Sequence, residues 1–153
     1  MVKPYFTNEK EDPEPLVVTV QRRVRFEETD PLGIVWHGRY SSYFEDARAA
    51  VGEKYGIGYM DFYRNETVAP LRIFHTDFLL PIGFQEDITI DGILRWSEAA
   101  RINFEYTIRN SRGEVTTRGY SVQVMLDLNN NLLLIPPRFY EDFLLRWKEG
   151  RLR

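Results

Sequence analysis

The stretch that decides the fold is a fifteen-residue run, Phe26-Glu27-Glu28-Thr29-Asp30-Pro31-Leu32-Gly33-Ile34-Val35-Trp36-His37-Gly38-Arg39-Tyr40. Within it, the segment from Asp30 to Gly33 carries an Asp-Pro pair and a glycine, which is a typical turn signal. Apolar and polar residues alternate before the turn, and from Tyr40 onward apolar residues recur every three or four positions. The run therefore marks the place where a strand ends, the chain turns and a helix begins.

The residues upstream of the run predict a strand with one buried face over residues 16–26. Its apolar face carries Leu16, Val18, Val20, Val24 and Phe26. Arg22 interrupts that face with a charge.

Downstream, the helical period predicts an amphipathic helix of about eighteen residues, roughly 27 Å long. It ends at Gly56 and is followed by a loop at residues 61–66. Alternation then predicts strands at 68–80, 88–96, 102–109 and 120–128, and a shorter helix over 139–147 after Pro137. Gly92 falls inside the second of these strands, so we interpret it as a bulge or as a point where another backbone comes close. A long helix beside an antiparallel meander indicates an α+β domain with about five strands.

Composition excludes several functional classes. The 153-residue chain has no cysteine, so disulfides, a thiolate nucleophile and thiolate metal sites are excluded. Its two histidines, His37 and His75, lack the ligand spacing of a zinc site, and we expect no metal and no cofactor. A formal net charge of −3 is not that of a nucleic-acid-binding domain. Without a signal peptide or an apolar run of about 20 residues, the sequence predicts a cytoplasmic protein with no membrane span.

The junction between turn and helix offers a site for chemistry. The first N–H groups of a helix have no partner inside the helix, and with the helix dipole they attract negative charge. A thioester carbonyl placed there would have its developing oxyanion stabilised. Asp30, ionised at neutral pH, could attack that carbonyl or deprotonate a water. From spacing alone, Asp30 equally fits a common turn residue, and His37 equally fits a surface residue at a helix start.

The run also resembles the signature of the 4-hydroxybenzoyl-CoA thioesterase family. These are hotdog-fold acyl-CoA thioesterases, with the bacterial Tol-Pal-associated acyl-CoA thioesterases as close relatives. The positions that the family pattern defines are filled here by Glu28, Asp30, Gly33, Val35, Trp36, His37 and Tyr40. The order of one strand, a helix and four strands over residues 16–128 is also that of a hotdog domain.

The resemblance implies roles for the motif residues. It makes Asp30 the catalytic carboxylate and gives the backbone N–H of His37 the task of polarising the thioester carbonyl. It makes four further motif residues candidates for substrate binding, namely Gly33, Val35, Trp36 and Tyr40, and of these Gly33 and Tyr40 match motif positions of a structural kind. It implies a single hotdog domain over residues 16–153, in which a long central helix is wrapped by the antiparallel sheet. The prolines and acidic residues of positions 1–15 indicate a lead-in with little structure of its own.

The resemblance further implies a homodimer or homotetramer that binds acyl-CoA where two subunits meet. Such an assembly would also cover unpaired strand edges. The sequence does not distinguish CoA from acyl carrier protein as the thioester carrier. Two alternatives stay open: a hotdog hydroxyacyl-thioester dehydratase that pairs His37 with Glu45 or Asp46, and a non-catalytic protein that binds acyl thioesters.

Overall fold

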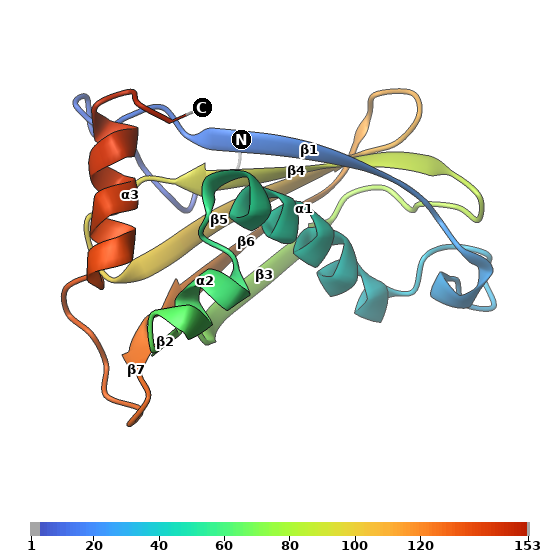
Figure 1. The fold of residues 1–153 in the computed structure, drawn as a ribbon. Coiled ribbons are helices and arrows are strands. Elements are labelled where there is room, and N and C mark those ends of the chain that lie inside the picture. The colour runs from blue at the N-terminus through green and yellow to red at the C-terminus, as the bar shows by residue number, and fades with distance from the viewer. Residues whose placement is uncertain (1–3, 153) are drawn as a thin grey trace.

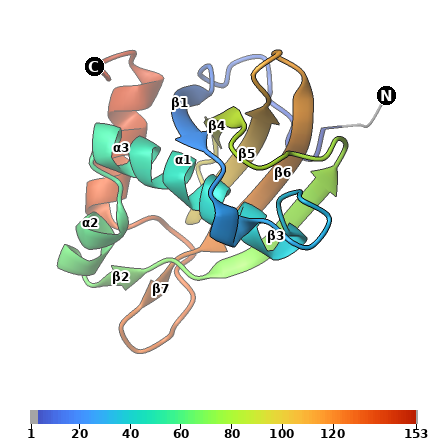
Figure 2. The ribbon, with the colours of Figure 1, turned by 90° about the vertical axis from the view of Figure 1, so that its right-hand side faces the viewer.

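The protein forms one five-stranded antiparallel sheet with a long helix packed lengthwise on one face (Figures 1 and 2). The computed structural model describes residues 4–152, so residues 1–3 of the predicted lead-in and residue 153 of the predicted domain lie outside the described residues. The elements in chain order are β1 (Leu16–Arg23), η1 (Phe26–Glu28), η2 (His37–Arg39), α1 (Tyr40–Tyr55), α2 (Tyr59–Arg64), β2 (Thr67–Val68), β3 (Leu71–Phe78), β4 (Asp87–Arg95), β5 (Arg101–Arg109), β6 (Val115–Val124), β7 (Leu126–Asp127) and α3 (Arg138–Lys148). The sheet has the order β1-β4-β5-β6-β3, and β2 pairs separately with β7. The predicted α+β class is confirmed.

Helix α1 is held on the sheet by the apolar stripe that its sequence predicts. The residues of this stripe that lie in the core are Tyr40, Tyr43, Phe44, Ala47 and Val51. The ring of Phe44 stacks on that of Tyr106 in β5, with centroids 4.5 Å apart. The helix ends, as predicted, at Gly56, which takes up a left-handed conformation with a φ of 69°. The packing of this stripe on the sheet fixes the position of the first turn of α1.

Gly92 lies where β4 passes beneath α1. It pairs with Val18 of β1 and Tyr106 of β5 in an unbroken register, so it is not a bulge. A Cβ atom added to Gly92 would lie 3.0 Å from the carbonyl oxygen of Ala47 in α1. The prediction of a close backbone approach is therefore confirmed, and the missing side chain sets how near the helix comes to the sheet.

The predicted loop at residues 61–66 is wrong, because residues 59–64 form the helix α2. The carboxylate of Asp61 accepts the N–H of Gly58 at 2.9 Å, which satisfies a backbone donor at the start of the helix. Phe62 is 3% exposed and packs its ring against those of Phe139 and Tyr140. This six-residue helix depends on contacts with the distant α3, which local periodicity does not reveal.

Two predicted strands are divided in the structure. The strand expected over 68–80 separates into β2 and β3 at Pro70, which has no N–H to donate to a ladder. The strand expected over 120–128 separates into β6 and β7 at Met125. The first strand is also shorter than predicted, because Phe26 belongs to the 3-10 turn η1.

Helix α3 and the lead-in, near the two ends of the described residues, are both held by contacts with the domain. Helix α3 begins directly after Pro137, as predicted, and its Trp147 donates an indole N–H to the carbonyl of Glu14 at 3.0 Å. The described part of the lead-in, residues 4–15, contains no helix or strand. It runs along the sheet face opposite α1 (Figure 2), where the ring of Tyr5 stacks on that of Tyr120 at 4.1 Å. No helix within residues 4–152 combines the length and the apolar character needed to cross a membrane.

Candidate active site

The motif folds into a tight hairpin between η1 and α1. Thr29 and Val35 pair as an isolated antiparallel bridge, and the N–H of Asp30 donates to the carbonyl of Ile34 at 2.9 Å. Gly33 closes the turn by donating its N–H to the carbonyl of Asp30 at 2.9 Å. Its φ of 77° is a conformation that glycine adopts without steric cost. Asp30 is therefore the first residue of a backbone-bonded turn.

The two arms of this hairpin are tied to each other and to the core. The N–H of Trp36 donates to the carbonyl of Glu28 at 2.9 Å, which closes the base of the hairpin. The N–H of Val35 donates to the carbonyl of Ile82 at 2.8 Å, in the segment that precedes β4. The returning arm then leads into the start of α1, so the turn and the helix start belong to one small rigid unit.

The carboxylate of Asp30 is half-buried and only partly engaged. Its Oδ1 accepts the N–H of Leu32 at 2.8 Å, which is the usual side-chain bond of an aspartate that begins a turn. Its second oxygen accepts no hydrogen bond from any residue in the described part of the chain. One oxygen therefore orients the group, and the other remains able to act on a ligand.

The start of α1 presents free backbone donors. The chain is extended at Trp36, turns through η2 and becomes α-helical at Tyr40. The N–H of Arg39 donates to the carbonyl of Trp36 at 2.9 Å. Within residues 4–152, the N–H groups of His37 and Gly38 donate to no acceptor, as expected for the first residues of a helical segment. Two exposed donors thus follow the arm that returns from Asp30.

The structure divides the predicted site residues between surface and core. Asp30, Gly33, Trp36 and His37 lie at or near the surface, whereas Val35 and Tyr40 are buried, at 3% and 4% exposure. Burial raises the pKa of the Tyr40 phenol, whose ring meets that of Phe78 at 4.9 Å. The buried pair holds the hairpin and the first helical turn on the core.

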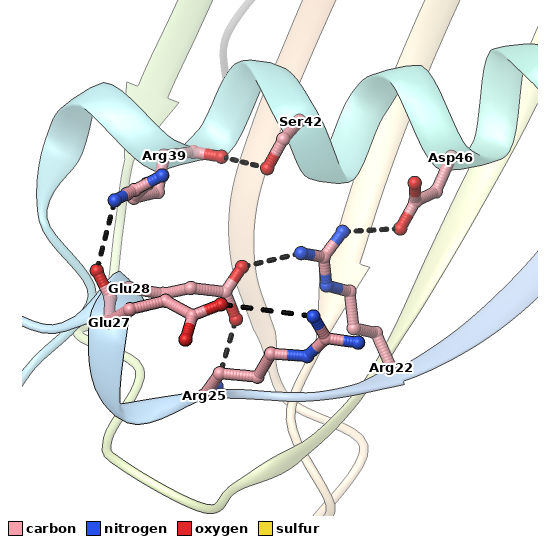
Figure 3. A network of polar contacts seen from close by, with 7 residues as sticks. All are labelled: Arg22, Arg25, Glu27, Glu28, Arg39, Ser42 and Asp46. Atoms are coloured by element: carbon pink, nitrogen blue, oxygen red, sulfur yellow. Dashed lines mark hydrogen bonds and ion pairs between the residues drawn. The ribbon is translucent and has the colours of Figure 1, made fainter.

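Glu28, a motif residue to which the sequence assigns no role, is a buried carboxylate two residues before Asp30. Its side chain is 3% exposed, and it accepts the N–H of Arg25 at 2.8 Å and the guanidinium of Arg22 at 2.6 Å (Figure 3). Arg22 also reaches the carboxylate of Asp46 on α1 at 2.5 Å. The charge of Arg22 on an otherwise apolar strand face is the sequence signal that could have found this cluster, because a buried charge needs a partner.

A cavity of about 510 Å³ lies beside α1. Its lining includes Ser41, Phe44, Glu45, Arg48, Tyr59, Phe74, Tyr106 and Gln123. Ser41 belongs to the first turn of α1, about one turn beyond the free N–H groups. Arg48 lies seven residues, or about two helical turns, further along α1, where it packs against Tyr59 of α2. The cavity therefore connects the hairpin end of the helix to a polar end wall.

Arg48 is fixed at that end wall. It bonds both oxygens of Glu45, at 2.9 and 2.7 Å, and its guanidinium lies 3.7 Å from the ring centroid of Tyr59. Burial opposes the charge of Arg48, but the bond to Glu45 raises its pKa above the ordinary value. The end wall is therefore a neutralised ion pair covered by an aromatic ring.

Two carboxylates of α1, Glu45 and Asp46, are engaged with arginines. Glu45 pairs with Arg48 and Asp46 pairs with Arg22, and neither forms a hydrogen bond with His37 in the described structure. The histidine–carboxylate pair required for the dehydratase alternative is therefore not formed. The residues that the structure describes also contain no cluster of three or more histidines and carboxylates that could hold a metal ion.

A larger and more open hollow, of about 850 Å³, lies beside the hairpin. Its arginines are each paired with a carboxylate: Arg22 with Glu28 and Asp46, Arg23 with Asp87, and Arg25 with Glu27. Because these charges already neutralise one another, the apolar cavity along α1 is the better candidate for a ligand site.

The part of the chain that contains the hairpin and the cavity matches a known protein family. Residues 24–144 match the thioesterase-like superfamily, from just before the hairpin to the last turn but one of α3. The chain belongs to the thioesterase-like superfamily. YneP of Bacillus subtilis, provisionally named an acyl-CoA thioesterase, is 25% identical over 104 residues, which cover 68% of this chain and 75% of YneP. A protein of Aquifex aeolicus provisionally named an esterase is 26% identical over 121 residues, covering 79% of this chain and 93% of that protein.

Solved structures show that this thioesterase-like chain has the hotdog fold. The DHNA-CoA thioesterase of Staphylococcus aureus matches with a TM-score of 0.74 at 22% identity, covering 90% of this chain and 97% of that one. The 1,4-dihydroxy-2-naphthoyl-CoA thioesterase of Synechocystis matches with a TM-score of 0.74 at 16% identity, covering 84% of this chain and 96% of that one. A Staphylococcus aureus protein whose structure was determined in complex with CoA matches with a TM-score of 0.77 at 12% identity, covering 95% of this chain and 90% of that one. The predicted hotdog fold is confirmed.

Proposed function

We propose that this protein hydrolyses acyl-CoA thioesters to a free acid and CoA, with Asp30 as the reactive carboxylate. The observation that carries the proposal is the junction itself. A carboxylate with one unbonded oxygen begins a turn, and the returning arm ends at two backbone donors that have no acceptor among residues 4–152. Membership of the thioesterase-like superfamily, and relatives named as acyl-CoA thioesterases, support the same reaction class.

In the proposed mechanism, the thioester carbonyl oxygen accepts hydrogen bonds from the N–H groups of His37 and Gly38. These donors lie at the positive end of α1, where they stabilise the negative charge that develops on that oxygen. Asp30 attacks the carbonyl carbon, the carbon–sulfur bond breaks and CoA leaves as the thiolate. Water then hydrolyses the resulting anhydride. In the general-base form of the mechanism, Asp30 instead takes a proton from the water that attacks the carbonyl.

The cavity beside α1 is the proposed acyl site. From Ser41 to Arg48 the helix rises seven residues, which is about 10.5 Å. An extended carbon chain with ordinary bond lengths and angles advances about 1.25 Å per bond. The cavity therefore suits an acyl group of roughly eight carbons, or an aromatic acyl group of similar length.

The remaining predictions from the sequence belong to the same proposal. They include membership of the 4-hydroxybenzoyl-CoA thioesterase family, a single domain over residues 16–153 after a lead-in, and a cytoplasmic location. Gly33 and Trp36 border the proposed substrate site at the surface, and the buried Val35 and Tyr40 support it from the core. A homodimer or homotetramer is supported by the edge strand β3, one side of which has no neighbour in the sheet and which exposes Leu71, Phe74 and Phe78.

The test is a thiol-release assay across acyl-CoA thioesters of different length and shape, with acyl carrier protein thioesters included. Asp30→Asn should lower the rate at least ~10²-fold, because it removes a nucleophile or base. Asp12→Asn is a matched control, since Asp12 also accepts a backbone N–H in a half-buried turn and lies in the lead-in. Wild-type activity in Asp30→Asn would overturn the assignment.

A second experiment separates the two forms of the mechanism. In a single turnover in oxygen-18 water, an anhydride intermediate places the label in the Asp30 carboxylate when water attacks on the enzyme side. Label in the Asp30 carboxylate would support attack by Asp30. Label found only in the released acid is common to general-base hydrolysis and to attack of water on the acyl carbon of the anhydride.

A further inference from the structure

Arg22 is a charged residue at a position where the pattern of β1 calls for an apolar one. Its side chain is 22% exposed, and its two terminal nitrogens bond different partners (Figure 3). One donates to Glu28 at 2.6 Å and the other to Asp46 at 2.5 Å, while the guanidinium lies 4.8 Å from the ring centroid of Tyr43. A single cation thus joins β1, the 3-10 turn η1 and helix α1.

Glu28 is the most deeply buried member of this group. One carboxylate oxygen accepts the N–H of Arg25 and the other accepts the guanidinium of Arg22, so both oxygens are engaged. Its backbone carbonyl accepts the N–H of Trp36, one residue before His37. The same residue therefore holds the arm that carries Asp30 and the arm that leads to the free donors.

The charges in this cluster keep one another in place. Burial disfavours the charge of Arg22, yet Asp46 and Glu28 raise the pKa of Arg22 above its ordinary value, so the cation is retained. Asp46 is 46% exposed at the outer end, whereas Glu28 has almost no contact with solvent. Removal of the charge on Glu28 would leave Arg22 partly buried with only its outer partner, which favours a different position for Arg22 and the hairpin.

We propose that Glu28, held by Arg22, is a positioning residue that sets Asp30 against the N–H groups at the start of α1. The inference rests on the proposed function, because it concerns how the same carboxylate is placed. Positioning matters because reacting atoms must be held within about 0.5 Å of their productive geometry. The turn at Asp30 is closed by its own backbone bonds, and backbone bonds from Val35 and Trp36 tie its returning arm to the core and to Glu28. The Glu28–Arg22–Asp46 chain of contacts adds a direct side-chain link from the arm that carries Asp30 to α1.

The test measures kcat and KM separately by thiol release, using the acyl-CoA that the wild-type protein hydrolyses best. Glu28→Gln keeps the size of the side chain and an acceptor for Arg25 but removes the charge that binds Arg22. We expect kcat to fall about ten- to hundredfold, the range for misplacement of a reacting group by up to 1 Å. KM should stay at the wild-type value, because Glu28 does not line the acyl cavity. Glu27→Gln, at an exposed neighbouring position, should leave both constants unchanged.

A double variant tests whether Arg22 and Glu28 act as one unit. The losses in kcat of Arg22→Met and Glu28→Gln should not multiply when combined, because both changes break the same contact. Losses that multiply would overturn the role given to Arg22. A purely structural role predicts a different result. The melting temperature and the folded fraction would then fall, while kcat per folded molecule and KM would both stay at their wild-type values.

The outcomes distinguish this inference from the function on which it rests. Wild-type kcat in Glu28→Gln, with Asp30→Asn inactive, overturns the positioning role alone. Full activity in Asp30→Asn overturns the proposed function and the positioning role with it. Should Glu28→Gln fail to fold, Asp46→Asn decides at the exposed end of the cluster: a lower kcat supports the positioning role, and a wild-type kcat overturns it.

Discussion

Replacement of Gly92 by alanine should lower the melting temperature, although alanine is the better strand residue of the two. Gly92 lies in β4 directly beneath α1. An added Cβ would lie 3.0 Å from the carbonyl oxygen and 3.1 Å from the carbonyl carbon of Ala47. Carbon atoms in good contact lie about 3.5–4.0 Å apart, so α1 would have to move by roughly 0.5 Å. The obstacle is helix backbone, which cannot rotate out of the way as a side chain can.

The size of the effect follows from two opposing contributions. Overpacking a well-packed contact costs about 1–3 kcal/mol, while replacing a strand glycine by alanine gains roughly 0.5–1 kcal/mol. The middle of each range gives a net loss of about 1 kcal/mol, and the extremes give about 0 and 2.5 kcal/mol. With an unfolding entropy of about 2.1 cal/mol/K per residue, a net loss of about 1 kcal/mol should make a chain of this length melt roughly 3–4 °C lower.

The assay is thermal unfolding of the wild type and of three variants, followed by circular dichroism. Gly92→Val should melt lower than Gly92→Ala, because a larger side chain displaces the helix further. Gly83→Ala is the matched control: its Cβ would meet only an oxygen of Glu86, at 3.8 Å, so its melting temperature should stay equal or rise slightly. A melting temperature of Gly92→Ala equal to or above that of the wild type would refute the reasoning, since strand propensity would then outweigh the helix contact.

Two further predictions concern the acyl cavity and acid stability. Tyr59→Ala should open the end wall at Arg48, so that a longer acyl chain fits the cavity. The kcat/KM for dodecanoyl-CoA relative to that for octanoyl-CoA should then rise roughly tenfold, the scale on which apolar pockets discriminate between substrates. An unchanged ratio would show that the acyl group lies elsewhere. Stability should fall as pH is lowered below the ordinary aspartate value of 3.8, because bonds from the backbone and side chain of Asn131 lower the pKa of Asp127 in the folded state. This contribution is complete above that pH and is lost as Asp127 becomes protonated. Asp127→Asn should therefore lose less melting temperature than the wild type between pH 5 and pH 2, and equal losses would contradict the assignment.

Local patterns in the sequence were sufficient for the larger elements. The period of three to four residues predicts α1 because its apolar stripe must face one side of a helix. Alternation of apolar and polar residues predicts the strands of the meander, because successive side chains of a strand point to opposite faces of the sheet. The short helix α2 was missed, because Phe62 is buried by α3, about eighty residues further along the chain. The division at Pro70 was missed although proline interrupts a ladder, because the apolar run continues through it.

The candidate site was predicted in part. Asp30, Gly33 and His37 follow from a contiguous motif, and the structure brings them together in one hairpin whose returning arm enters α1. The cavity beside α1 was not predicted, because its walls come from two helices and three strands. Glu28 was identified only as a motif position and its role was not predicted, since its burial depends on contacts that only the folded chain makes.

The sequence by itself determined the helical and strand periods, the turn at Asp30 and the free backbone donors after it. Each of these depends on residues that are neighbours in the chain. Only the tertiary structure decided that Gly92 lies under Ala47, that Arg22 bridges Glu28 and Asp46, and that an apolar cavity runs from the helix start to Arg48. The physical reason is that these contacts join segments that are separate in sequence. Their distances are set by how α1 packs on the sheet, which no local pattern specifies.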